Sequence, residues 1–415
     1  MKKLLFLGGF PQMIDMVMTA KRMGIYTLLA DRNPESPAKR FVDKAFDIST
    51  NDIDALVSIC KIEKVDGVFT GFEDFNIHVA RELCSRLDLP FYATGEQLNV
   101  ITNKNKFKDF CRKNSVPTIE QYTLTEAEND GKYPYIVKPA DSYGSRGITV
   151  CHNWEELRCG YEKARESSAS KNTIIERFVD SPYGVELFYT VINGDIHLTV
   201  TADRYVAKTG LTTVPLPVAE VFPSKHAAEL HEKMDLNIRN MLRNLGVQNG
   251  LVLIQALYED GDFYVYEMAY RLTGEQHYRL VGKQHGVNLE EMLIKLALNE
   301  PVNDFDSDLV DDASFIYPSI NLAVLLKPGT IAKIEGLSDV YQLEDVVSIN
   351  LIHAEKDTIE ATGNYSHILL RINMVSSAYE NLCDSVAKVN ALIKVTSTEG
   401  EDMLASRFDL RAWGR

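Results

Sequence analysis

The first hundred residues alternate between short apolar runs and segments with helical spacing, and this alternation limits the fold more than any other feature. Three runs have the length and composition of buried strands: Leu4–Leu7, Tyr26–Ala30 and Gly67–Thr70. Three other segments repeat apolar residues at helical intervals: Met13–Met23, Ile53–Lys61 and Ile77–Leu87. Strands that alternate with helices predict a parallel sheet with helices on its faces. We therefore expect an α/β domain at the start of the chain.

The rest of the chain predicts a mixture of helices and longer strands. Helices are expected over Leu98–Asn114, Trp154–Glu166, Ala227–Leu245, Leu289–Leu298 and Ala378–Leu392. Strands are expected over Tyr135–Lys138, Gly147–Val150, Thr173–Phe178, Leu187–Val191, His197–Thr201, Leu251–Tyr258 and Phe263–Met268. A chain of 415 residues is too long for one ordinary core, so two or three domains are expected.

Charge and cysteine content exclude several classes of protein. The net charge of −15 argues against nucleic acid or an anionic membrane as the main partner, because both bind basic surfaces. No stretch reaches the roughly 18 apolar residues of a membrane span. The apolar run at the N-terminus ends at Gly8, so it indicates a strand rather than a signal peptide. Six cysteines without a C-x-x-C pair predict reduced thiols and a cytoplasmic location.

A lysine at the end of an apolar strand precedes a small, polar loop. Val137, Lys138 and Pro139 lead into residues 141–147, which include two glycines. Backbone N–H groups in such a loop can approach phosphate oxygens closely, and the lysine adds a positive charge. An ordinary hairpin turn is the alternative, with the glycines serving only for positive φ.

Two further segments carry polar groups of the kind that bind a nucleotide. Lys104 opens a helix thirteen residues before Pro117, although a solvated basic face would give the same pattern. The strand that contains Glu176 runs into Phe178 and Val179, where backbone groups can meet a purine edge. Glu186 lies ten residues beyond Glu176 and can accept hydrogen bonds from ribose hydroxyls. An ordinary edge strand is the alternative for this segment.

The hairpin near residue 260 predicts a metal site. A three-residue loop centred on Gly261 would place Gln255 opposite Glu267, and opposed residues on paired strands share a face. Their oxygens could then bind Mg²⁺, which prefers hard ligands. Arg271 supplies a planar cation for a phosphate or carboxylate four residues after Glu267. A surface hairpin with solvated charges remains the alternative.

These four segments, in this order, resemble the ATP-grasp superfamily, and most closely its carboxylate–amine ligases and biotin carboxylase-like members. The resemblance covers most of the chain. It implies a Rossmann-like N-terminal domain, a two-subdomain ATP-grasp fold that holds ATP between its halves, and a small C-terminal α+β lobe. The corresponding boundaries are residues 1–100, 101–305 and 306–415.

The resemblance also implies a role for each matching residue. The ATP-binding positions are Lys104, Lys138, Ser142, Gly144, Ser145, Gly147, Glu176, Arg177, Phe178, Val179 and Glu186. The metal ligands are Glu267 and Gln255, for Mg²⁺ or alternatively Mn²⁺. Arg271 and Lys138 match the residues that assist phosphoryl transfer.

Two positions depart from the family pattern. Gln255 stands where an acid is usual, and it offers an amide oxygen without charge. Ala269 stands where an asparagine ligand is common, and it offers no ligand atom. A second metal ion is therefore in doubt, unless Glu275 points inward and compensates.

The function implied is an ATP-dependent ligase that joins a small-molecule carboxylate to an amine through an acylphosphate. Its expected partners are these substrates and, among proteins, a second copy of itself in a homodimer. A non-catalytic nucleotide-binding protein is one alternative, favoured by the altered metal positions. An NAD-dependent oxidoreductase is another, but residues 1–100 lack the G-x-G-x-x-G pattern.

Overall fold

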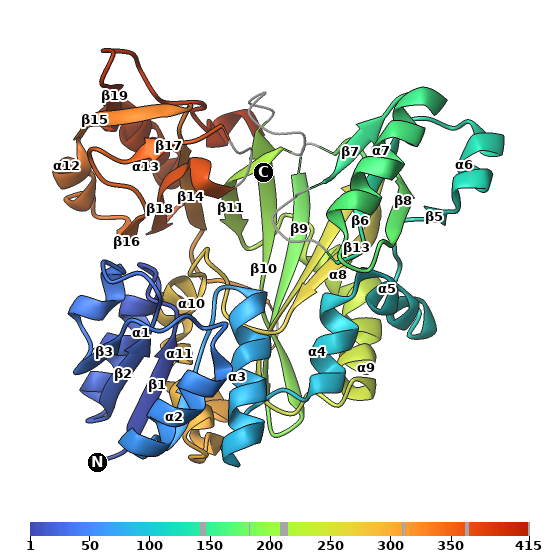
Figure 1. Ribbon diagram of the computed structural model, residues 1–415. Coiled ribbons are helices and arrows are strands. Elements are labelled where there is room, and N and C mark those ends of the chain that lie inside the picture. The colour runs from blue at the N-terminus through green and yellow to red at the C-terminus, as the bar shows by residue number, and fades with distance from the viewer. Residues whose placement is uncertain are drawn as a thin grey trace.

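The computed structural model describes residues 1–141, 147–181, 183–207, 215–308, 311, 313–361 and 365–413. An N-terminal α/β unit, a small sheet, a large sheet and a C-terminal layer make up the molecule (Figure 1). The predicted combination of α/β and α+β architecture is confirmed. Among the helices in these ranges, none has the length and apolar character needed to cross a bilayer.

The N-terminal unit has a parallel four-stranded sheet in the order β3-β2-β1-β4. Its strands are β1 (Lys3–Leu7), β2 (Tyr26–Ala30), β3 (Lys44–Phe46) and β4 (Gly67–Phe69). Its helices are α1 (Met13–Arg22), η1 (Pro37–Arg40), α2 (Ile53–Glu63) and α3 (Asp74–Leu87). The chain runs outward from β1 through β2 to β3 and then crosses to β4, so the direction of winding reverses between β1 and β4.

One predicted helix, Leu98–Asn114, is wrong as a continuous element. The structure has two helices, α4 (Gly95–Thr102) and α5 (Lys104–Lys113). Asn103 separates them with an extended backbone, and its side chain accepts a hydrogen bond from the N–H of Lys106. An asparagine in this conformation ends one helix and caps the next. The break makes Lys104 the first residue of α5.

The small sheet is ordered β5-β8-β6-β7 and carries two helices. Its strands are β5 (Gln121–Tyr122), β6 (Tyr135–Pro139), β7 (Thr149–Cys151) and β8 (Thr173–Arg177). Its helices are α6 (Leu124–Asp130) and α7 (Trp154–Ser167). Leu157 and Ala164 of α7 share a buried cluster with Tyr135, Val137 and Ile175 of the sheet, so the small sheet has its own core.

The large sheet has eight antiparallel strands in the order β13-β12-β9-β10-β11-β14-β18-β16. They are β9 (Tyr183–Ile192), β10 (Asp195–Ala207), β11 (Leu216–Phe222), β12 (Gly250–Glu259), β13 (Asp262–Ala269), β14 (Ser319–Leu325), β16 (Val346–Leu351) and β18 (Ile368–Val375). Strand β11 was not expected, because Pro217 interrupts its sequence. Strand β11 pairs with β14 only from Ala219 onward. The missing N–H of Pro217 therefore costs no hydrogen bond to β14.

Helices also lie between strands of the large sheet along the chain. They are α8 (Ala227–Leu230), a π-helical turn η2 (His231–Asp235), α9 (Leu236–Asn244), α10 (Tyr278–His285), α11 (Leu289–Ala297) and η3 (Asn303–Asp308). The predicted helix Ala227–Leu245 is thus present but contains a π turn. Residues of α1, β1, β9, β10 and α11 share one core, so the N-terminal unit is packed against the large sheet.

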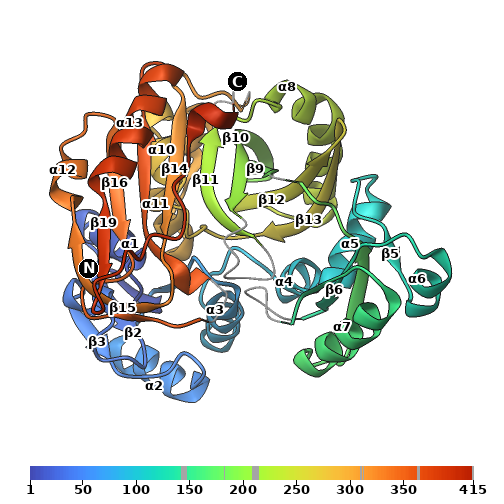
Figure 2. The ribbon, with the colours of Figure 1, turned by 90° about the horizontal axis from the view of Figure 1, so that it is seen from above.

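The C-terminal layer covers the end of the large sheet that contains β14, β16 and β18. A three-stranded sheet in the order β17-β15-β19 consists of β15 (Gly329–Glu335), β17 (Thr358–Ile359) and β19 (Lys394–Ser397). The helical elements are α12 (Leu337–Tyr341), η4 (Tyr365–His367), α13 (Tyr379–Leu392) and η5 (Leu410–Trp413). Figure 2 shows this layer and the small sheet on opposite sides of β9 and β10.

Candidate active site

Strands β12 and β13 place Gln255 directly opposite Glu267. The turn between them has two residues, Asp260 and Gly261, both with positive φ, instead of the three expected. A register irregularity between Gln255 and Ala256 offsets this difference of one residue. The two side chains therefore share a face, although the turn is shorter than predicted.

The Gln255 amide faces away from Glu267 towards the next strand. Its Nε2 donates to Oε1 of Glu186 on β9, at 2.6 Å. Glu186 is buried, and Nε of Arg204 lies 3.4 Å from the same carboxylate oxygen. Burial and the nearby Glu275 raise the pKa of Glu186 to about 7. Glu267, in contrast, is exposed, so its carboxylate is the accessible charge of the hairpin.

Two lysines, one from a helix and one from a strand, lie on the side of the molecule that faces this hairpin. Lys104 begins α5, and Lys138 lies near the end of β6. Burial, with Lys138 nearby, lowers the pKa of the Lys104 ammonium, while Glu267 acts in the opposite direction. Lys104 therefore lies near both Lys138 of the small sheet and Glu267 of the large sheet.

Glu176 has different partners from those predicted. Its backbone pairs with both Gln121 and Ile136, so its N–H and C=O belong to the small sheet. Its buried carboxylate forms ion pairs with Lys108 of α5 and with Lys138, at 2.7 Å to Nζ of the latter. Burial raises the pKa of Glu176, but the two lysines outweigh it and lower the pKa overall. Glu176 therefore holds Lys138 in position, and Lys108 balances the charge.

Only part of the predicted phosphate loop lies in the described residues. Ser142, Gly144 and Ser145 lie outside them. Asp141, at the start of the loop, accepts hydrogen bonds from Ser168 Oγ and from the N–H groups of residues 169 and 170. Gly147, at its end, has φ of +75°, and a Cβ there would lie 2.7 Å from Cβ of Ser167. Both ends of the loop thus lie close to the C-terminal end of α7 and the residues that follow it.

The predicted adenine-binding segment begins where β8 ends. Arg177 forms an ion pair with Glu259 of β12 at 2.7 Å and lies over the ring of Tyr264. Phe178 donates its N–H to the C=O of Pro134, and Val179 is buried. These contacts join the small sheet to the hairpin beside Tyr135, at the end of β6 opposite to Lys138.

Arg271 is held by the N-terminal unit. Its Nε lies 2.6 Å from Oδ1 of Asp74, the first residue of α3. The carboxylates of Glu267 and Glu275 also help to raise the pKa of Arg271. Arg271 therefore lies between the hairpin carboxylate and the N-terminal unit.

A second charged cluster on the large sheet was missed by sequence reasoning. Arg371 of β18 contacts Oε1 of Glu275 at 3.0 Å and Oδ1 of Asn321 at 2.6 Å. Glu220 of β11 is fully buried, with an oxygen 3.9 Å from Arg371. Glu275 thus points to the C-terminal strands rather than to Glu267. A charged residue in the middle of an apolar strand, as in Leu-Leu-Arg-Ile-Asn, is a signal that could have revealed this cluster.

The gathered charges suit a polyphosphate with a divalent cation. Lys104 and Lys138 supply positive charge to phosphate oxygens. Glu267 supplies a hard carboxylate oxygen, and Gln255 has a carbonyl oxygen besides the amide bound to Glu186. In the part of the chain that the structure describes, no three His, Cys, Asp or Glu residues are grouped to hold a metal.

Comparison with known families agrees with this arrangement. Residues 103–305 match the family model described as "Carbamoyl-phosphate synthase L chain, ATP binding domain". A formate-dependent phosphoribosylglycinamide formyltransferase from Sulfurisphaera tokodaii is 29% identical over 234 residues, which are 54% of this chain and 55% of that protein. The chain spans about half the length of the first curated relatives it matches.

Other similarities extend over most of the chain. The 2-oxoglutarate carboxylase small subunit of Hydrogenobacter thermophilus is 23% identical over 398 residues, covering 89% of this chain and 81% of that protein. The crystal structure of an L-amino acid ligase from Bacillus licheniformis superposes with a TM-score of 0.77 at 18% identity, covering 96% of this chain and 99% of the other. At this identity the superposition establishes the fold.

Proposed function

The chain belongs to the ATP-grasp superfamily, and on this basis we propose that it is an ATP-dependent carboxylate–amine ligase that releases ADP and phosphate. The observation that carries the proposal is that Lys104 and Arg271 lie near the exposed carboxylate of Glu267, with Lys138 close to Lys104. Three cations and one accessible acid, supplied by separate elements, suit a bound triphosphate with its metal.

The reaction has two steps. A carboxylate oxygen of the first substrate attacks the γ-phosphorus of ATP, and the bond to the β–γ bridging oxygen breaks to release ADP. The amine nitrogen then attacks the acyl carbon of the acylphosphate, phosphate leaves, and the nitrogen loses a proton. Positioning and charge neutralisation supply most of the catalysis in such transfers.

Each residue of the site has a part in these steps. Lys104 and Lys138 neutralise the triphosphate, and Glu176 keeps Lys138 directed at it. Arg271 steadies the phosphoryl group as it moves. Phe178 and Val179 contact adenine, while Glu186 accepts from ribose hydroxyls.

Mg²⁺ or Mn²⁺ would neutralise phosphate charge and is assigned to Glu267, with Gln255 as a weaker ligand. We extend the proposal to the domain division at residues 100 and 305, a cytoplasmic location and a homodimer. A biotin carboxylase domain of similar fold that forms a dimer supports the homodimer.

The decisive experiment measures ADP formation from MgATP with pools of small carboxylates and amines. ADP that depends on both pools supports the ligase. The second candidate, a non-catalytic nucleotide-binding protein, is favoured by Gln255 and Ala269 at the usual ligand positions. It predicts that MgATP raises the melting temperature while no pool elicits ADP.

A further inference from the structure

Residues 270–277 connect β13 to α10 through turns and irregular backbone. This segment carries Arg271, assigned above to the phosphoryl group, and Glu275, which pairs with Arg371. Irregular backbone lacks the repeating hydrogen bonds of a helix or a sheet, so contacts from other parts of the molecule set its conformation. The residues that supply these contacts therefore decide where Arg271 and Glu275 point.

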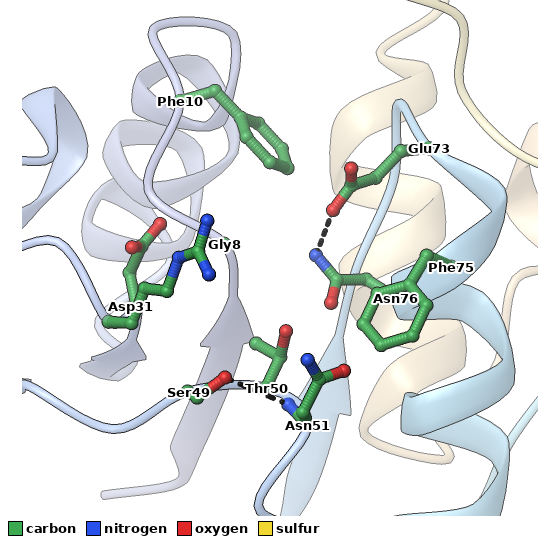
Figure 3. Close-up of a pocket in the computed structure, with 10 residues that line it drawn as sticks. Gly8, Phe10, Asp31, Ser49, Thr50, Asn51, Glu73, Phe75 and Asn76 are labelled. Atoms are coloured by element: carbon green, nitrogen blue, oxygen red, sulfur yellow. Dashed lines mark hydrogen bonds between the residues drawn. The ribbon is translucent and has the colours of Figure 1, made fainter. Parts of the chain in front are cut away.

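The loop before α3 holds the first part of this segment. Phe72, with φ of +72°, donates its N–H to the C=O of Leu272 at 3.0 Å, and the first residue of α3 pairs with Arg271. The start of α3 is itself fixed, because Nδ2 of Asn76 donates to Oε1 of Glu73 (Figure 3). Arg271 is thus anchored to the N-terminal unit through its side chain and through the backbone of its neighbour.

The second part of the segment contains a residue in a conformation that side chains disfavour. Gln276 has φ of +58°, in the left-handed region, where the Cβ of any residue other than glycine costs free energy. Gln276 is buried and closes a turn: its N–H donates to the C=O of Thr273 at 3.2 Å, and its C=O accepts from the N–H of Arg279 at 3.0 Å. This φ sets the direction in which the chain leaves Glu275 and enters α10. Such a conformation persists only where its surroundings hold it.

Asp15, in the first turn of α1, provides this hold. Its Oδ2 accepts hydrogen bonds from Nε2 of Gln276 at 2.9 Å, from the hydroxyl of Tyr278 at 2.8 Å and from Nε of Arg279 at 2.8 Å. Its Oδ1 accepts from the same guanidinium group. The Asp15 side chain is 14% exposed, so water competes little for these charge-assisted bonds. One carboxylate of the N-terminal unit thus joins Gln276 to the first turn of α10.

Glu275 lies directly before Gln276 and near two arginines. Its Oε1 is 3.0 Å from a guanidinium nitrogen of Arg371, and its C=O accepts from Nδ2 of Asn321 at 2.7 Å. Burial raises the pKa of this carboxyl, but nearby arginines, Arg371 first and Arg271 among them, lower it overall. A displaced Glu275 would leave Arg371 without this carboxylate and would change the charge beside Arg271.

We propose that Asp15 is a positioning residue of the ligase, which keeps Gln276 left-handed and thereby keeps Glu275 near both arginines. The proposal rests on the ligase function and assigns Asp15 no contact with substrate or nucleotide. The lysines assigned to ATP lie on α5 and β6, so ATP affinity should depend little on Asp15. The charges around the transferring phosphoryl group should depend on it strongly.

Steady-state ADP formation by the full chain tests the effect on the reaction. Asp15→Asn keeps the shape of the side chain but loses its charge, and we expect kcat to fall about tenfold or more with KM for MgATP nearly unchanged. Gln276→Gly, introduced into Asp15→Asn, removes the Cβ that opposes positive φ and should raise kcat again by about fivefold. This rescue separates positioning from a general loss of stability.

Lys64→Gly in the Asp15→Asn background is the matched control. Lys64 is exposed at the end of α2 and has φ of +56°, so glycine there relieves a similar backbone penalty outside the segment. It should leave the low kcat of Asp15→Asn unchanged. Equal rescue by the two glycines, or a wild-type kcat in Asp15→Asn, would overturn the proposal.

Two variants at Gln276 repeat the test with Asp15 intact, in case Asp15→Asn does not fold. Gln276→Ala and Gln276→Gly both lose the amide and differ by one methyl group. Alanine keeps the penalty at positive φ without the hydrogen bond that offsets it, so its kcat should be about fivefold lower than that of glycine. Equal kcat values would show that the conformation at this position does not affect the reaction, and the proposal would fail.

Hydrogen–deuterium exchange without nucleotide separates this proposal from the ligase function. The N–H groups of Gln276 and Arg279 form the bonds of the turn, and both should exchange faster in Asp15→Asn. If the wild type forms no ADP with any substrate pool, the ligase function is refuted, and faster exchange still shows that Asp15 holds the segment. Unchanged exchange in Asp15→Asn would refute the hold itself, whatever the ADP result.

Discussion

Asp74 and Arg271 form an ion pair, with 2.6 Å between Oδ1 and Nε, although 197 residues separate them in the chain. Asp74 begins a helix of the N-terminal unit, and Arg271 follows the hairpin that carries Glu267. Both side chains are less than a quarter exposed, at 23% and 15%. The N-terminal unit therefore sets the position of an arginine assigned to phosphoryl transfer.

Asp74→Asn should lower turnover more than it lowers ATP affinity. The amide keeps the shape but loses the charge that holds Arg271, whose guanidinium would then move towards Glu267 or Glu275. A fall in kcat of about tenfold or more is expected from the loss of a charge-assisted hydrogen bond. ADP formation and MgATP titration measure the two effects. Asp54→Asn, which alters an exposed ion pair with Arg86, should change neither. A wild-type kcat in Asp74→Asn would contradict this role.

Glu267→Gln should abolish magnesium-dependent ADP formation and leave the fold intact, because its carboxylate is exposed and carries the accessible charge of the hairpin. Circular dichroism and the magnesium dependence of the rate provide the measurement. Unchanged magnesium dependence would show that the metal binds elsewhere.

Gln255→Glu should destabilise the protein without metal. The change places an acid where the family pattern usually has one. In the structure the amide donates to Glu186, so a carboxylate would face another carboxylate across 2.6 Å. We expect a lower melting temperature, partly recovered by MgATP. A variant as stable as the wild type without metal would argue that the Gln255–Glu186 bond contributes little.

Lys138→Ala and Lys108→Met should have different consequences, although both lysines pair with Glu176. Lys138 is more accessible, and its loss should weaken ATP binding by about 1.5–3 kcal/mol. Lys108 is 2% exposed, and its loss leaves a buried carboxylate with one cation, which should mainly reduce stability. Calorimetric titration with MgATP and urea unfolding separate the two effects. Equal losses of affinity would show that Lys108 also contacts the nucleotide.

Sequence reasoning succeeded where the signal was local. Alternating strands and helices identified the N-terminal sheet, and the spacing from Gln255 to Glu267 identified the hairpin pair. It failed where the outcome depended on distant partners. Nothing in the segment of Glu176 shows that Lys108 and Lys138 pair with its carboxylate. Arg371 and Asp74 were overlooked because their partners lie far away in the chain.

Gly67→Ala should disturb the packing of β4 against α11 and destabilise the protein. A Cβ at Gly67 would lie 2.2 Å from the backbone oxygen of Ala297 in α11, and backbone cannot yield cheaply. A loss of stability of about 1–3 kcal/mol or more is expected from this overpacking. Gly282→Ala is the control: the nearest atom is 3.4 Å away, and alanine should favour helix α10 by about 0.5–1 kcal/mol. Urea unfolding compares the two variants.

Glu290→Gln should remove a pH dependence of stability. Burial, with the Asp15 charge, raises the pKa of Glu290 from 4.5 to about 7 in the folded protein. The folded state therefore keeps this proton longer than the unfolded state, and ionisation costs stability as pH rises from about 4.5 to 7. The variant should match the wild type near the lower value and exceed it above pH 7. A constant difference across this range would mean that Glu290 titrates normally.

The continuity of the large sheet has a consequence for any attempt to isolate the nucleotide-binding part. The family match ends at residue 305, yet β11 pairs with β14, which begins at Ser319. A fragment that stops at 305 would leave β11 with free N–H and C=O groups along one side. Leu216, Val218 and Val221, now buried with the C-terminal layer, would become solvent-exposed. An apolar, unprotected strand of this kind recruits other chains. The residues after 305 therefore cover an edge that would otherwise be open to pairing with another chain.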